Sequence, residues 1–225
     1  NVIGIWDTRN YELIDTIHTV SNNVRSVQWS PDGTHLVIGG WGIYTSVIEY
    51  PSKRLVSRFT SSGKERLAKW MPDGQSLVCE GENNTTLVLV DSNTGAAIGN
   101  PISPNMGNIW DFEPHPTKPW MAICGPTGNT VIWDIENSIA LREFNDRSSY
   151  VFCVRWHPEK DLVLATGLEK YVSEYSINFN SVESYTSPDQ VPGWIYAQWH
   201  PRGKYFTISG DQPGEVRIVD ARTYE

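Results

Sequence analysis

Trp29-Ser30-Pro31-Asp32-Gly33 is the stretch that decides the fold, because its pattern of an aromatic residue, any residue, Pro and a turn recurs along the chain. The recurrences are Trp70-Met71-Pro72-Asp73-Gly74, Phe112-Glu113-Pro114, Trp156-His157-Pro158 and Trp199-His200-Pro201-Arg202-Gly203. Their first residues are spaced by 41, 42, 44 and 43 positions. A pattern that returns at such a narrow period indicates a repeat protein.

A second pattern has the same period. It is a short run rich in β-formers that ends in an aromatic or aliphatic residue, often followed by Asp. It occurs at residues 3–7, 47–50, 87–91, 131–134, 172–175 and 216–220. The ending residues, counted from Trp6, are spaced by 44, 40, 43, 42 and 44 positions. Two patterns with one period establish a repeat of about 43 residues.

Within one repeat the local patterns predict strands. Apolar and polar residues alternate over 24–29, Pro31-Asp32-Gly33 has the composition of a tight turn, and 36–38 is a short apolar run. A third strand is expected to end at Tyr50, and a fourth is expected at 55–60. Apolar residues show no helical period of useful length. Each repeat is therefore expected to form four short antiparallel strands.

A four-stranded repeat of this length with Trp-Asp endings resembles the WD-repeat β-propeller family over the whole chain. The resemblance is carried by Trp6-Asp7 and Trp133-Asp134, by Ser30-Pro31-Asp32-Gly33, and by His18-Thr19, which is similar to the family's Gly-His element. The family's Trp position holds Tyr50, Val90, Tyr175 and Val219 in the other four repeats. The family's buried polar network is thus mostly absent from the sequence. We expect apolar and aromatic packing to hold the blades together.

The resemblance implies an all-β fold, a propeller of four-stranded antiparallel blades, in a single domain over 1–225. Repeat units are expected near 1–18, 19–60, 61–102, 103–145, 146–186 and 187–225. They supply two strands, then four sets of four, then three. Either the chain is a segment of a larger, seven-bladed propeller that is incomplete at one or both ends, or residues 13–18 complete the last unit and close five blades. We favour the larger propeller.

Composition excludes several classes of protein. The 225 residues are 39% hydrophobic and 20% charged, with 26 Asp and Glu against 18 Lys and Arg, a formal net charge of −8. This acidic balance argues against direct nucleic-acid binding. No apolar run has the length of a membrane span, and the first residues do not read as a secretory signal. An intracellular protein, cytoplasmic or nuclear, is expected.

Residues with chemical potential are few and scattered. The three cysteines, Cys79, Cys124 and Cys153, form no metal or redox motif and are expected to be small core residues. His157 and His200 are expected to be outward-pointing turn residues, too far apart for a shared metal. No nucleophile, zinc or phosphate-binding motif is present. The prediction is a protein that is not an enzyme and has no cofactor and no metal.

The informative positions lie where each innermost strand is expected to begin. In the family that this chain resembles, the preceding loop opens on the top face of the propeller. Aligned on the turn aromatics, this position holds Arg25, Arg66, Asn108, Phe152 and Ile195. With their neighbours, the candidate partner-binding residues are Arg25, Lys64, Arg66, Asn108, Trp110, Tyr150, Phe152, Trp194 and Tyr196. Arg, Trp, Tyr and Phe are typical of interface hot spots.

The predicted function is a non-catalytic scaffold that binds a peptide or a partner subunit on this face, as a subunit of a larger complex. An acidic or phosphorylated peptide is a candidate partner, because Arg25, Lys64 and Arg66 bring positive charge. Three alternatives stay open. The first is that these residues form only an ordinary solvated rim. The second is an architectural subunit that uses the propeller sides, and the third is an enzyme with a site in the central channel.

Overall fold

The computed structural model describes residues 2–19, 23–41, 44–60, 67–169, 171–178, 181–186, 194–210 and 216–224; for residues 23, 41, 82, 181–186, 194 and 195 it describes the backbone alone. The described chain is all β, with 21 strands and one 3-10 turn at Glu82–Asn84. No helix in these ranges is long and apolar enough to cross a membrane. The chain divides into two compact units, Asn1–Pro101 and Ile102–Glu225.

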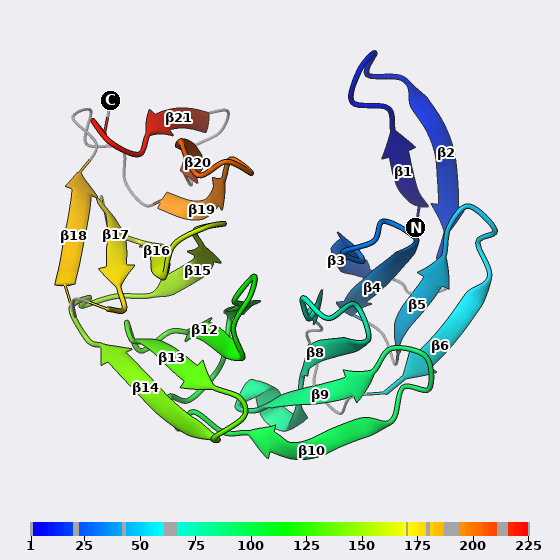
Figure 1. Ribbon diagram of the computed structural model, residues 1–225, viewed down its shortest axis with the longest axis horizontal. Coiled ribbons are helices and arrows are strands. Elements are labelled where there is room, and N and C mark those ends of the chain that lie inside the picture. Colours follow the sequence, from blue (N-terminus) through cyan, green and yellow to red (C-terminus); the bar gives the residue numbers. More distant parts are fainter. Residues whose placement is uncertain are drawn as a thin grey trace. The chain divides into compact units, whose positions relative to one another are not determined.

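The N-terminal unit contains three antiparallel sheets (Figure 1). The first is the pair β1 (Val2–Trp6) and β2 (Leu13–His18). The second has the order β3-β4-β5-β6, and the third has the order β10-β9-β8-β7. The strand bounds are β3 Asn23–Trp29, β4 His35–Trp41, β5 Thr45–Glu49, β6 Leu55–Phe59, β7 Ala68–Trp70, β8 Ser76–Glu80, β9 Leu87–Asp91 and β10 Ala97–Ile102.

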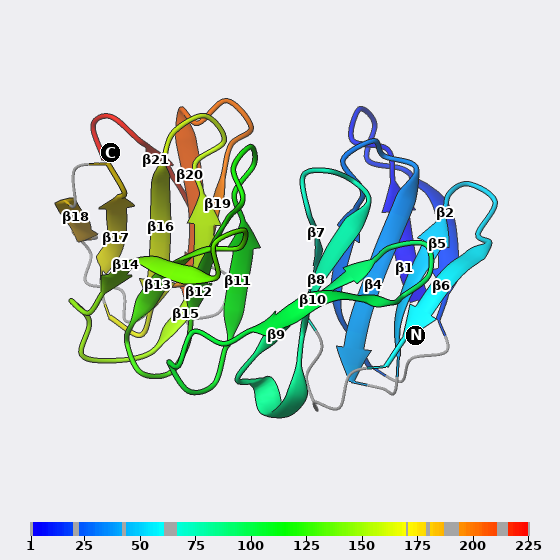
Figure 2. The same ribbon diagram turned by 60° about the horizontal axis from the view of Figure 1, so that its bottom comes forward.

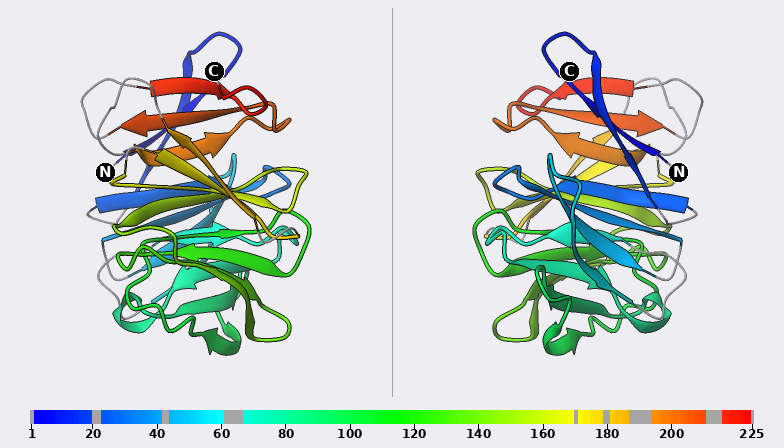
Figure 3. Two further views of the ribbon diagram at one scale, coloured as in Figure 1. Left: turned by 90° about the vertical axis from the view of Figure 1, so that its left-hand side faces the viewer. Right: turned by 90° about the vertical axis from the view of Figure 1, so that its right-hand side faces the viewer.

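The C-terminal unit contains three more antiparallel sheets, stacked one above another in the left-hand view of Figure 3. Their orders are β11-β12-β13-β14, β15-β16-β17-β18 and β19-β20-β21, so each sheet follows the chain from the inside outward. The strand bounds are β11 Asp111–Pro114, β12 Trp120–Cys124, β13 Thr130–Asp134, β14 Ile139–Phe144, β15 Val151–Trp156, β16 Leu162–Gly167, β17 Tyr171–Ser176, β18 Ser181–Thr186, β19 Trp194–Trp199, β20 Tyr205–Gly210 and β21 Val216–Asp220.

These sheets are propeller blades of the predicted kind, and the fold class is confirmed. Four sheets have four strands each, and consecutive strands pair through short turns (Figure 2). A single domain over the whole chain, and a ring of seven blades, stay predictions.

The turn at Pro31-Asp32-Gly33 has the structure that its residues predict. Gly33 has φ +71° and donates its N–H to the Ser30 carbonyl at 2.9 Å. The Asp32 carboxylate accepts hydrogen bonds from the Ser30 hydroxyl at 2.6 Å and the Thr34 N–H at 3.0 Å, which lower the pKa of Asp32 to about 2. The turn is thus fixed locally by one glycine and one carboxylate.

Apolar faces of neighbouring sheets pack together to form the core within each unit. In the N-terminal unit, Phe59 and Trp70 lie in one buried cluster with residues of the two four-stranded sheets. In the C-terminal unit, Tyr175 and Trp156 belong to a cluster shared by β11–β14 and β15–β18. All three cysteines are buried in the core, as predicted. Successive side chains of a strand point to opposite faces, so the nearly continuous runs of buried residues in β8, β12 and β16 bury both faces of their sheets.

One part of the predicted repeat register is wrong. The strand-ending hydrogen bond runs from His157 N to Leu162 O, and its counterpart in the preceding blade runs from His115 N to Trp120 O, both at 2.8 Å. Pro114 therefore occupies the place in its repeat that Trp156 occupies in the next one. Phe112, which the sequence analysis aligned with Trp156, lies two residues before that place. Because Phe112-Glu113-Pro114 imitates the aromatic-x-Pro pattern, the sequence alignment shifted this repeat by two positions.

Candidate functional site

Three innermost strands, β3, β15 and β19, begin with an irregularity that leaves one residue out of the pairing register. The register shifts between Val24 and Ser26 in β3, between Val151 and Cys153 in β15, and between Trp194 and Tyr196 in β19. The extra residues are Arg25, Phe152 and Ile195. A β-bulge of this kind re-aims a side chain at the end of a strand.

A glycine lies opposite each of these bulges: Gly40 pairs with Val24, Gly167 with Val151 and Gly210 with Trp194. In two further sheets a glycine directly follows the second strand, Gly81 after β8 and Gly125 after β12. A Cβ on Gly125 would overlap the carbonyl oxygen of Asn108, and a Cβ on Gly167 would overlap that of Tyr150. The backbone before the bulge therefore lies directly against these glycines.

The corrected register changes the candidate set. Trp110, not Asn108, corresponds to Phe152, and Asn108 corresponds to Tyr150. The Trp110 N–H donates to the Cys124 carbonyl at 2.9 Å, just before β11 begins.

Three of the candidate residues form one cluster in the C-terminal unit, the aromatic cluster of Trp110, Tyr150 and Phe152. The rings of Trp110 and Phe152 are stacked, with centroids 5.0 Å apart and planes 10° apart. Tyr150 meets Trp110 edge-on at 5.0 Å and lies 6.1 Å from Phe152. Tyr150 is 43% exposed, and Trp110 and Phe152 are half-buried. Equivalent positions on two consecutive blades thus build one partly exposed aromatic surface.

A buried ion pair fixes the loop that carries Tyr150. The Arg147 side chain is fully buried, and its Nη1 lies 2.9 Å from Glu169 Oε2. Arg147 Nη2 donates to the Ala165 carbonyl at 2.7 Å, and Ser149 N donates to Glu169 Oε1 at 2.9 Å. The position of Tyr150 is therefore set before any partner arrives.

The other candidates do not join the aromatic cluster. Arg25 is exposed at its bulge in the N-terminal unit. Lys64 and Arg66 lie outside the described residues, and Trp194 is described only as the first backbone position of β19. Tyr196, in β19, is 59% exposed and makes no ring contact with the three clustered rings in the described part of the chain.

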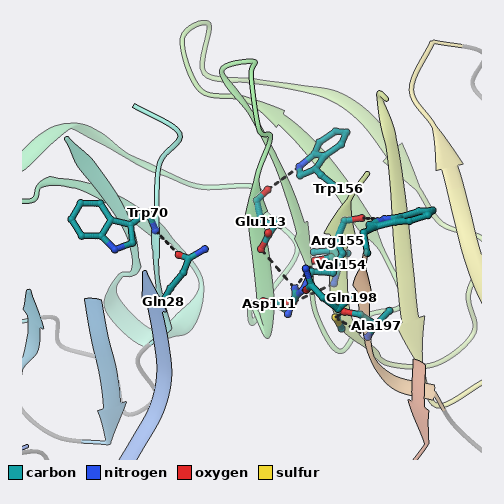
Figure 4. Close-up of polar contacts among 11 residues, drawn as sticks. Gln28, Trp70, Asp111, Glu113, Val154, Arg155, Trp156, Ala197 and Gln198 are labelled. Atoms are coloured by element: carbon teal, nitrogen blue, oxygen red, sulfur yellow. Dashed lines mark hydrogen bonds and ion pairs between the residues drawn. The ribbon is translucent and has the colours of Figure 1, made fainter. Parts of the chain in front are cut away.

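Polar contacts between innermost strands were missed by the sequence analysis, which expected packing alone to hold the blades together (Figure 4). Corresponding side chains on three blades receive the N–H of the next innermost strand. They are Ser26 for Ala68 at 3.4 Å, Asp111 for Val154 at 3.2 Å, and Cys153 for Ala197 at 3.5 Å. The pairs lie 42 to 44 residues apart, so one repeat period already predicts which residues could meet.

Arg155 is the most connected of these side chains. Its Nη1 bonds Asp111, its Nε donates to Gln198 Oε1 at 3.1 Å, and Glu113 lies 3.8 Å away. Burial disfavours the charged guanidinium, but the carboxylates of Asp111 and Glu113 outweigh it and hold the pKa of Arg155 well above its usual value. Arg155 on β15 therefore links Asp111 on β11 with Gln198 on β19.

The prediction that His157 points outward is wrong. Its side chain is buried against Trp199, and its Nε2 lies 3.3 Å from the Gly203 carbonyl of the next blade. His200, in the corresponding position, is exposed. No group of three or more His, Cys, Asp or Glu in the described ranges could hold a metal ion.

The chain is similar in sequence to several known proteins. Residues 12–42 match the family described as WD domain, G-beta repeat. Actin-interacting protein 1 of Drosophila melanogaster is 22% identical over 225 residues, which cover 98% of this chain and 30% of that protein. WD repeat-containing protein AAC3 of Dictyostelium discoideum is 24% identical over 157 residues, 64% of this chain and 30% of that protein.

GATOR2 complex protein WDR24 of Xenopus laevis is 32% identical over 80 residues, 35% of this chain and 10% of that protein. The chain thus spans no more than 30% of the length of these three relatives. Four-stranded antiparallel blades with repeated turns define a β-propeller. The matched repeat, the relatives and the blades together support the WD-repeat β-propeller family for this chain, and no subfamily is assigned.

Proposed function

We propose that this chain is a non-catalytic protein–protein interaction scaffold whose aromatic cluster docks a peptide or a partner subunit. The observation that carries the proposal is the stacking of Trp110 on Phe152, with Tyr150 exposed beside them. Rigid aromatic side chains that are partly buried before binding are the usual anchors of protein interfaces.

The relatives support a role in protein assemblies. One is named as a protein of the GATOR2 complex, and another is named as actin-interacting. WD-repeat propellers are generally non-catalytic interaction modules. By this analogy we propose an intracellular location, cytoplasmic or nuclear, and membership of a larger complex.

A second contact is proposed for the N-terminal unit. Arg25 is exposed at the bulge of β3, and Lys64 and Arg66 precede β7 in the sequence. An acidic or phosphorylated segment of a partner would be recognised there by bidentate hydrogen bonds from Arg. Charge reversal at Arg25, written Arg25→Glu, tests this contact separately from the aromatic cluster.

The deciding experiment compares variants in affinity purification from the native source. The tagged chain, Trp110→Ala, Tyr150→Ala and the control Trp6→Ala are used, because Trp6 is 59% exposed outside the cluster. A partner held by the cluster is recovered with the unchanged chain and with Trp6→Ala, and falls about tenfold or more with Trp110→Ala. Equal recovery with all four proteins contradicts the cluster and favours docking on the propeller sides.

A further inference from the structure

We propose that the aromatic cluster receives a lysine or arginine side chain from a basic segment of the partner. This inference deepens the proposed function and rests on it. It names the chemistry that the cluster selects, and it differs from the acidic segment proposed for Arg25 in the other unit.

Charge is distributed unevenly between the two units. Residues 102–225 contain 16 Asp and Glu against 10 Lys and Arg, whereas residues 1–101 contain 10 against 8. The acidic excess is therefore six residues in the unit that carries the aromatic cluster and two in the other unit. The more negative unit attracts cationic segments more strongly.

The rings themselves favour a cation. An aromatic face carries negative potential, and Trp and Tyr bind ammonium and guanidinium groups over it. This chain uses such contacts internally. Lys118 Nζ lies 4.2 Å from the centroid of Trp120, and Arg147 Cζ lies 4.6 Å from that of Tyr171. No Lys or Arg of the described part of the chain lies over Trp110, Tyr150 or Phe152. Their cation would come from outside.

The cluster is also held ready for such a ligand. The Tyr150 carbonyl accepts the Leu168 N–H at 3.2 Å, and the preceding residues are anchored by Arg147 and Glu169. Leu168, 40% exposed, adds an apolar neighbour that can cover the methylene stem of a lysine or arginine. Because the backbone at Tyr150 is already held in place, binding costs little conformational entropy in the protein. A single lysine or arginine side chain of the partner can therefore contribute measurably to the affinity.

The test uses immobilised nonapeptide arrays in which the central residue is Lys, Arg, norleucine or Glu and the flanking residues are shared. Binding of the purified full chain is measured at low and at physiological salt. Arrays with central Lys or Arg should retain several-fold more protein, up to about tenfold, than the norleucine array. Tyr150→Phe should keep this preference, because the aromatic face remains, and Tyr150→Leu should reduce it. Tyr150 is exposed enough for both variants to fold.

Each other outcome is decisive. If norleucine peptides bind as well as lysine peptides and both depend on Trp110, the cation preference is wrong and the docking function stands. A preference for central Glu also overturns the inference. If no array distinguishes Trp110→Ala from the unchanged chain, then docking at the cluster is contradicted as well, for every peptide in the arrays.

Discussion

The indole ring of Trp110 and the phenyl ring of Phe152 are stacked, with planes 10° apart. The two residues are 42 positions apart in the sequence and occupy the same place in consecutive blades. Their contact means that the first positions of neighbouring innermost strands present side chains to each other. A surface assembled in this way is specified by the repeat, while its chemistry is specified by the residues that each blade places at these positions.

The stacked pair should be energetically coupled. A double-mutant cycle with Trp110→Leu and Phe152→Leu is expected to give an interaction free energy of about 0.5–1.5 kcal/mol, the range for aromatic pairs beyond area burial. Urea unfolding of the four proteins measures it. Additive effects of the two substitutions would show that the rings merely lie near each other.

The Arg147–Glu169 pair should matter more to stability than any exposed ion pair of this chain. Arg147→Met leaves the Glu169 carboxylate without its partner, at an expected cost of about 3–5 kcal/mol in the free energy of unfolding. Arg54→Met is the control, because Arg54 pairs with Glu49 at 3.1 Å on the surface and should cost about 0–1 kcal/mol. Urea denaturation provides both values. Similar losses in the two variants would contradict the role given to burial.

The glycine opposite the bulge is expected to be sterically required. Gly167→Ala places a Cβ against the Tyr150 carbonyl and should destabilise the chain by about 1–3 kcal/mol, as overpacking does. The control is Gly4→Ala, whose Cβ would meet only side-chain atoms of Trp6 and Leu13, which can move. Thermal unfolding compares the two variants with the unchanged chain. A neutral Gly167→Ala would mean that the backbone at Tyr150 moves freely.

Sequence periodicity predicts the blades because alternation and turn chemistry act locally. The same local reasoning misplaced one repeat, since Phe112-Glu113-Pro114 carries the turn pattern two residues before the true position. The correcting signal was available in the glycines. In every repeat a glycine lies 11 positions after the first residue of the turn pattern, once Pro114 is taken as that residue in place of Phe112. These glycines are Gly40, Gly81, Gly125, Gly167 and Gly210. A steric requirement across two strands marks the register more reliably than a turn motif.

The contacts between blades could not be predicted in the same way. Whether Asp111 accepts the Val154 N–H or faces water depends on the distance between two innermost strands, and the sequence does not encode that distance locally. The buried position of His157 has the same origin, because the next blade covers it. The aromatic cluster was only half predicted. Its members were named, but their meeting depends on the bulge geometry.

Two corresponding tryptophans should differ in their sensitivity to losing the indole N–H. Trp156 Nε1 donates to the Glu113 carbonyl at 2.9 Å, whereas Trp70 Nε1 is buried with no hydrogen-bond partner among the described residues. Beyond the packing loss common to both, Trp156→Phe should lower the free energy of unfolding by about 1 kcal/mol more than Trp70→Phe. Urea denaturation tests the difference, and an equal loss would show that the Glu113 contact contributes nothing.

Two buried histidines predict how stability depends on pH. In His157, Nδ1 accepts the N–H groups of Glu159 and Lys160 at 3.0 and 3.1 Å, so the proton resides on Nε2, which faces the Gly203 carbonyl. In His115, Nδ1 likewise accepts the N–H groups of Thr117 and Lys118 at 3.1 Å, and Nε2 faces Asp161 Oδ1 at 3.2 Å. Burial lowers the pKa of both; for His115 the nearby Asp161 opposes the effect without cancelling it.

Because these pKa values are lower in the folded chain than in the unfolded chain, the unfolded state binds protons first as the pH falls. The stabilisation they provide is complete above the unfolded pKa of about 6.5 and is lost as the pH falls through the lower folded values. Free energies of unfolding at pH 7.5 and pH 5.0 should therefore show a decrease at the lower pH. In the double variant His115→Asn, His157→Asn the side-chain carbonyl can still accept a turn N–H but cannot titrate. Its decrease should be clearly smaller, and an unchanged decrease would assign the pH dependence to other groups.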